Sequence, residues 1–142
     1  MKSEDILQSL LHDTLILGLK TQSFHWNVEG PHFGPLHTLF GTQYEALQEA
    51  ADLIAERLRA LGDYPHPHNN NKGGEVVDEI PKEPPDAAKM VEILALDHQK
   101  LGLFCAKTSD SVAKKDPATA NMLADRQMAH EKDAWMLRSH LK

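Results

Sequence analysis

Apolar residues recur at helical spacing along most of the chain, and this periodicity constrains the fold more strongly than any other feature. One stretch places Phe40, Leu47, Ile54 and Leu61 at intervals of seven residues, which aligns them on one face of a helix. Three further stretches step by three and four residues, and none shows the sustained alternation of a β-strand. The sequence therefore predicts an all-α protein in which four amphipathic helices pack as a bundle.

Residues that favour helix ends mark the limits of the four segments. The expected marks are Ser3 capping a helix from about residue 4 to Asn27, Pro35 in the first turn of a helix that stops at Gly62, and Asp86 and Asp116 capping the third and fourth helices. The expected core stripes are Leu7, Leu10, Leu11, Thr14 and Leu17 on the first helix, Val91, Leu94, His98, Leu101, Cys105 and Thr108 on the third, and Leu123, His130, Ala134, Leu137 and Leu141 on the fourth. On these stripes His98 and His130 are expected to be structural.

The connections between the segments predict the topology. The first two helices, and the last two, are joined by short turns and should be antiparallel neighbours, whereas residues 63–85 are long enough to cross the bundle from end to end. One long crossover between helices two and three is typical of a ferritin-like four-helix bundle. Within it, Val76, Val77 and Ile80 are expected to form a short apolar helix. We expect one domain over residues 1–142.

Charge and composition exclude several classes of protein. The formal net charge is −6 and the sequence pI is about 5.8, which argues against a protein that wraps nucleic acid or adheres to anionic lipid. No apolar run approaches the roughly 20 residues of a membrane span. The single Cys105 has no partner for an internal disulfide, and the acidic MKSEDILQSLL is unlike a signal peptide. These features indicate a cytoplasmic protein.

Histidines and carboxylates with metal-ligand chemistry fall in two places. His25 and His37 flank a Gly-Pro turn, and Asp52 and Glu56 stand four residues apart on the second helix, so each pair can converge on a cation. Such i,i+4 acids are more often solvated surface than ligands. The Glu-x-x-His pairs of an internal di-iron centre are missing, since the one literal match lies in the turn.

The two ligand pairs cannot meet within one chain. His37 and Asp52 are fifteen residues apart, which is about 22 Å along a straight helix. Two copies of this helix, packed antiparallel about a two-fold axis near Tyr44 and Glu45, would bring the histidines of one copy to the carboxylates of the other. The pattern therefore favours a metal site shared between subunits.

Four stretches carry a combined signature: FHWNVEGPHFGPLHTLF, the region around Tyr44, DLIAERLRALG and HEKDAWMLRSHL. In combination they resemble the Dps mini-ferritins, the DNA-protection-during-starvation proteins, over nearly the whole chain. The resemblance implies a hollow homo-dodecamer that oxidises ferrous iron, preferably with hydrogen peroxide, and stores the ferric product, so protecting against oxidative stress. Carried over by position, it makes His25 and His37 ligands from one subunit, Asp52 and Glu56 ligands from its mate, and Trp26 the aromatic neighbour of the centre.

The chain departs from that family at one important position. The family usually carries an acid four residues after the second histidine, where this chain has Gly41. The site would then hold one iron firmly and a second weakly, and a carboxylate introduced at Gly41 is expected to strengthen the second position. The alternative function is a non-enzymatic metal-sequestering or structural cage, in which Gly41 leaves a single-metal or zinc-type site that is impaired as a ferroxidase.

Two further features bear on partners. Asn121, Asp125 and Glu131 occupy a region that in the resembling family lies near three-fold pores, and a solvated helix face explains them about equally well. Family members that bind DNA often use a lysine-rich tail, but this chain begins MKSEDI and ends RSHLK. The residues therefore do not support DNA binding.

Overall fold

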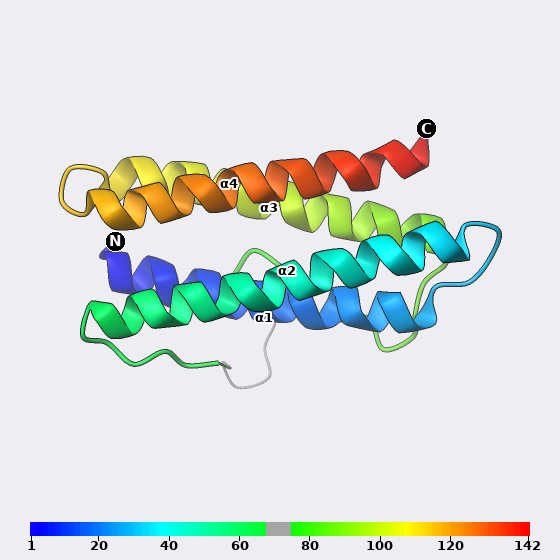
Figure 1. Cartoon of the computed structure of the whole chain (residues 1–142), viewed down its shortest axis with the longest axis horizontal. Helices are drawn as coiled ribbons and strands as arrows, with labels where there is room; N and C mark the ends of the chain where they lie inside the picture. Colours follow the sequence, from blue (N-terminus) through cyan, green and yellow to red (C-terminus); the bar gives the residue numbers. More distant parts are fainter. Residues whose placement is uncertain (68–74) are drawn as a thin grey trace.

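The computed structural model describes residues 1–67 and 75–142 and shows an elongated bundle of four long helices (Figure 1). The helices are α1 (Ser3–Asn27), α2 (Phe33–Ala60), α3 (Ala87–Val112) and α4 (Pro117–Arg138), followed by a 3₁₀ turn, η1 (Ser139–Leu141). The described residues contain no strand. The all-α bundle of four helices that the periodicity predicts is confirmed.

The helices form two antiparallel hairpins, α1 with α2 and α3 with α4. The chain leaves α2 at one end of the bundle and enters α3 at the other, so the crossover runs the full length of the molecule (Figure 1). A buried ion pair joins the hairpins, since Nζ of Lys20 on α1 lies 2.9 Å from Oδ2 of Asp97 on α3. None of the described helices combines the length and apolar character that a membrane span requires.

Two of the expected helix caps are confirmed and two boundaries differ. Asp86 accepts from the backbone N–H of Lys89 at 2.8 Å, and Asp116 accepts from that of Thr119 at 3.1 Å. Ser3 is not a cap, because α1 already includes it and its first hydrogen bond runs to Lys2. The second helix starts two residues before Pro35, which the first turn tolerates because its N–H groups need no intrahelical acceptor.

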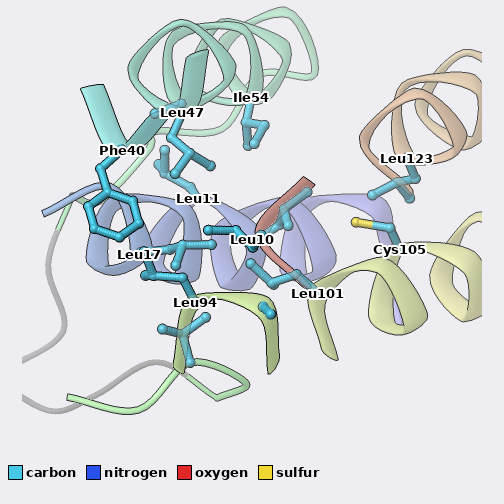
Figure 2. Packing of buried hydrophobic residues seen from close by; sticks show 14 of the residues in the cluster. Leu10, Leu11, Leu17, Phe40, Leu47, Ile54, Leu94, Leu101, Cys105 and Leu123 are labelled. Carbon is cyan, nitrogen blue, oxygen red and sulfur yellow. The ribbon is translucent and has the colours of Figure 1, made fainter. Parts of the chain in front are cut away.

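Leucine, isoleucine and phenylalanine side chains from the helices interdigitate along the bundle axis (Figure 2). Leu10 and Leu17 of α1 lie toward Leu94 and Leu101 of α3, and all four are buried. The predicted stripes are buried with three exceptions: Leu61 and Thr108 are only half-buried, and Leu141 is 43 % exposed. Leu141 leaves the core because α4 gives way to the 3₁₀ turn before reaching it.

The expected short helix in the crossover is wrong, because residues 75–77 form bends whose backbone is bound by Asp13 of α1. Oδ1 of the buried Asp13 accepts from the N–H groups of Val76 at 3.2 Å and Val77 at 2.9 Å, and Val77 inserts into the core. Burial raises the pKa of Asp13, and its two backbone hydrogen bonds oppose that rise. One carboxylate thus satisfies two backbone N–H donors of the crossover.

Candidate metal centre

A tight turn brings the two predicted histidines together at one end of the bundle. Val28 ends α1 in an extended conformation with its N–H bonded to the carbonyl of Phe24 at 2.9 Å. Gly30 then adopts φ +109°, which favours glycine, and its carbonyl accepts from the N–H of Phe33, the first residue of α2. His25 and His37 therefore face each other from the last turn of α1 and the first turns of α2.

The two imidazoles are oriented by a reciprocal pair of hydrogen bonds. Nδ1 of His25 lies 2.7 Å from the carbonyl oxygen of His37, and Nδ1 of His37 lies 2.7 Å from that of His25. A carbonyl oxygen can only accept, so Nδ1 carries the hydrogen in each ring. In the neutral imidazole this leaves Nε2 as a lone-pair donor, the form that metal coordination requires. The two backbone carbonyls thus select the tautomer of each ring in which Nε2 carries the lone pair.

Ring stacking restricts the pair further. The centroids of His25 and His37 are 3.9 Å apart with 13° between the planes, and Phe33 stacks on His37 at 5.0 Å and 21°. Sequence reasoning missed Phe33. Its position four residues before His37 on the same helix was the available signal, since residues at i and i+4 share a face.

The predicted carboxylates lie elsewhere on the same helix. Asp52 and Glu56 are exposed, one turn apart, toward the end of α2 that is remote from the histidines (Figure 1). Within residues 1–67 and 75–142, no three histidine, cysteine, aspartate or glutamate side chains of one chain converge as a metal site. One chain therefore brings His25 and His37 together and keeps Asp52 and Glu56 apart from them.

Comparison with known proteins shows the family to which the chain belongs. The family model described as "Ferritin-like domain" matches residues 4–142. A DNA protection during starvation protein from Helicobacter pylori strain J99 is 31 % identical over 144 residues, which cover 99 % of both chains. The chain belongs to the Dps family of ferritin-like proteins. Membership places it among proteins that, in general terms, store iron and protect against oxidative damage.

Two other comparisons extend the likeness. A low temperature-induced protein from Nostoc sp. strain PCC 7120 is 36 % identical over 146 residues, covering 97 % of this chain and 79 % of its own. The crystal structure of a Dps protein from Bacillus brevis superimposes with a TM-score of 0.91 at 28 % identity, covering 100 % of both chains. The Dps fold thus extends over the whole chain.

Other residues singled out from the sequence lie on the surface of this Dps chain. Asn121, Asp125 and Glu131 are exposed on α4, and Glu131 accepts a hydrogen bond from the amide of Gln127 at 2.9 Å. Trp26 is 66 % exposed beside His25. These positions are compatible with a pore and with an aromatic neighbour, and both roles remain proposals.

A second histidine pair lies inside the Dps bundle, but an arginine makes it unsuitable for a metal. Nδ1 of His98 and Nδ1 of His130 are 2.9 Å apart, and Nη2 of Arg126 lies 3.2 Å from Nε2 of His130. Arginine can only donate, so His130 accepts at Nε2 and donates from Nδ1 to His98. The single ligand lone pair of His130, at Nε2, and the Nδ1 lone pair of His98 are therefore occupied, and the guanidinium repels a cation.

The interior pair is fully buried, and one of its nitrogens is unsatisfied. Nε2 of His98 is buried and has no hydrogen-bond partner among the described residues. Burial lowers the pKa of His98 to about 3, and the charge of Arg126 adds to the shift. Burial also lowers the pKa of His130, and the neighbouring His98 and Arg126 add to the shift. Nearby, burial raises the pKa of Asp133 to about 6.

Proposed function

We propose that the chain is a ferroxidase mini-ferritin, which oxidises ferrous iron with hydrogen peroxide and stores the ferric product inside a hollow cage. The observation that carries this proposal is the histidine half-site. Both Nδ1 atoms are committed to carbonyl oxygens at 2.7 Å, so the Nε2 atoms of His25 and His37 remain for a metal. The half-site thus offers two imidazole lone pairs at the edge of the bundle, which is the form in which histidine binds a metal.

The proposed site is shared between two subunits. His37 and Asp52 are fifteen residues apart on the continuous helix α2, which corresponds to about 22 Å. A two-fold axis near Tyr44 and Glu45 would place two copies of α2 antiparallel, so that Asp52 and Glu56 of the partner subunit complete the ligand set. Imidazole nitrogen and carboxylate oxygen together suit iron.

The chemistry of this site follows from its ligands. Two carboxylates offset the metal charge and favour the ferric product over the ferrous substrate. Two ferrous ions bound together at one site each give up one electron. One hydrogen peroxide accepts both electrons, its O–O bond breaks, and its oxygens leave as hydroxide or, after protonation, water. The reaction removes ferrous iron and peroxide together, which fits a protective role.

A second candidate function is a cage that sequesters metal without oxidising it. The observation in its favour is Gly41, which supplies no ligand one turn after His37. A site with one metal would bind a cation such as zinc and oxidise iron slowly. Counting iron ions per subunit under anaerobic conditions, and then following oxidation with peroxide and with oxygen, separates the two candidates.

The decisive test uses two inactive chains. The first variant is His25→Ala/His37→Ala and the second is Asp52→Ala/Glu56→Ala, and each homo-oligomer lacks half of every proposed site. In a mixed two-fold dimer, one site carries both lesions and the other is wild type. Co-expression should therefore restore part of the ferrous oxidation rate.

The control for this test is the composition of the cages. Mass spectrometry confirms that both chains are present, and cages mixed from two copies of the same variant give the background rate. Verified mixed cages with no more activity than either parent would contradict a shared site, because sites formed within one chain cannot be rescued.

A further inference from the structure

Gly41 lies directly against the His25 imidazole, so its missing side chain has a positive role. A Cβ atom built on Gly41 would lie 3.0 Å from Cε1 and 3.1 Å from Nδ1 of His25. These separations are well inside ordinary van der Waals contact, which is near 3.5–4.0 Å. The ring of His25 thus occupies the space beside α2 that any other residue at position 41 would fill.

The His25 ring has little freedom to move away from an added side chain. Its Nδ1 is bonded to the carbonyl of His37 at 2.7 Å, so a shift of a few tenths of an ångström lengthens that bond. The His37 ring stacks on it at 3.9 Å, and Phe33 stacks on His37 in turn. Contact with Gly41, the backbone hydrogen bond and the stack together determine where Nε2 of His25 points.

We propose that Gly41 is a positioning residue of the metal half-site. The absence of a Cβ lets His25 lie against the α2 backbone, and this placement directs its Nε2 toward the metal. The proposal rests on the function proposed above. It also reverses the expectation from the sequence, because a carboxylate introduced at position 41 would displace one ligand while adding another.

The test compares alanine at two glycines of the same helix. Gly41→Ala adds a methyl group against His25, whereas Gly34→Ala adds one where nothing lies within 4 Å. Zn²⁺ serves as the probe because it is redox-inert and takes histidine and carboxylate ligands. Forcing the ring from its preferred rotamer is expected to weaken Zn²⁺ binding about three- to tenfold in Gly41→Ala. Gly34→Ala should bind Zn²⁺ like the wild type.

Nuclear magnetic resonance of the metal-free protein gives a readout that does not depend on metal binding. In the wild type, the ¹⁵N shifts should show His25 protonated at Nδ1 and not at Nε2. Gly41→Ala should change the His25 signals, and Gly34→Ala should leave them in place. Wild-type His25 protonated at Nε2 would overturn the proposal without any variant.

Two further outcomes would overturn the positioning role. If Gly41→Ala matches the wild type in both Zn²⁺ affinity and His25 signals, the His25 ring accommodates the added methyl group without losing its position. Gly41→Asp that binds Zn²⁺ more tightly than the wild type would show that the chain lacks a ligand there. A wild type that binds neither Zn²⁺ nor Fe²⁺ would instead contradict the proposed function, and the metal-free spectra would still decide the role of Gly41.

Discussion

The carboxyl group of Asp133 provides a prediction about pH at the scale of one residue. Burial raises its pKa from 3.8 to about 6, although the charge of Arg126 opposes the shift. The fold therefore favours the protonated carboxyl, and this contribution to stability is complete below about pH 3.8 and is lost as the pH rises through about 6. At pH 8, Asp133→Asn should raise the unfolding free energy by about 2–3 kcal/mol per chain.

The gain in unfolding free energy from Asp133→Asn should shrink as the pH falls toward 4, because the wild-type carboxyl is then protonated and uncharged. Guanidinium unfolding at fixed chain concentration, measured at several pH values, gives the difference. Asp110→Asn, at an exposed position on α3, is the matched control. An equal gain from Asp133→Asn at pH 4 and pH 8 would show that protonation of Asp133 is not the cause.

The interior histidines predict the opposite dependence on pH. The pKa of His98 falls from 6.5 to about 3 and that of His130 is also lowered, so the unfolded chain binds more protons below pH 6.5. Stability is complete above pH 6.5 and falls as the pH decreases toward 3. Between pH 4 and 6, removing one of these histidines in His98→Leu should reduce the slope of unfolding free energy against pH by about 1.4 kcal/mol per unit.

This slope is measured by chemical unfolding in the same way, with His140→Leu as the control for loss of a histidine at an exposed position. The absolute stability of His98→Leu is not the test, because the change also removes an acceptor from His130. An unchanged slope in His98→Leu would mean that the number of protons bound by His98 does not change on folding.

At the scale of elements, the crossover depends on side chains of α1. Gln8 donates to the carbonyl of Tyr64 at 2.6 Å and accepts from the N–H of His66 at 3.1 Å, and Asp13 accepts from Val76 and Val77 farther along. Asp13→Ala would leave the buried N–H of Val77 unpaired, at a cost of about 1–3 kcal/mol.

Hydrogen exchange checks this prediction for the crossover. The amides of Val76 and Val77 should exchange faster in Asp13→Ala, while amides in the middle of α3 should keep their wild-type rates. Asp5→Ala, at an exposed position on α1, is the control. If Val77 remains equally protected in Asp13→Ala, the carboxylate does not hold the crossover.

The elements also show what the sequence can predict and why the rest escapes it. Asp86 and Asp116 were identified correctly because a cap bonds to an N–H only three residues away. The path of Val77 was missed because it depends on Asp13, 64 residues earlier. The proximity of His25 and His37 follows from a short turn. Their stacking, and the contact with Gly41, depend on side-chain rotamers that no spacing encodes.

At the scale of the whole molecule, exposed apolar side chains predict assembly. Leu19 is 56 % and Leu53 is 60 % exposed on the α1/α2 hairpin, and Trp135 is 61 % exposed on α4. The Dps resemblance implies a dodecamer, and these exposed apolar side chains are available for contacts between its subunits. We expect a particle of about twelve times the 15.9 kDa chain. Sedimentation velocity that shows a stable monomer at micromolar concentration would contradict this expectation.

Charge leads to the last prediction, which concerns DNA. The chain carries 21 acidic and 15 basic residues, which gives a formal net charge of −6. In an assembly, the total negative charge grows with the number of subunits. Affinity for duplex DNA comes mainly from Lys and Arg that neutralise phosphates and release counterions, and an acidic particle repels the duplex instead. We therefore expect binding no tighter than micromolar at about 150 mM salt, where screening matches the cell.

Fluorescence anisotropy with a labelled duplex, in chelator-treated buffer at about 50 and 150 mM salt, measures this affinity and its salt dependence. A parallel titration with Mg²⁺ restored identifies binding that a divalent cation bridges between carboxylates and phosphates. Nanomolar affinity without divalent cations at the higher salt, together with a steep loss on further salt addition, would reveal a basic surface that the net charge conceals. Affinity that appears only with Mg²⁺ would agree with an acidic particle, because the cation would then supply the positive charge that the protein lacks.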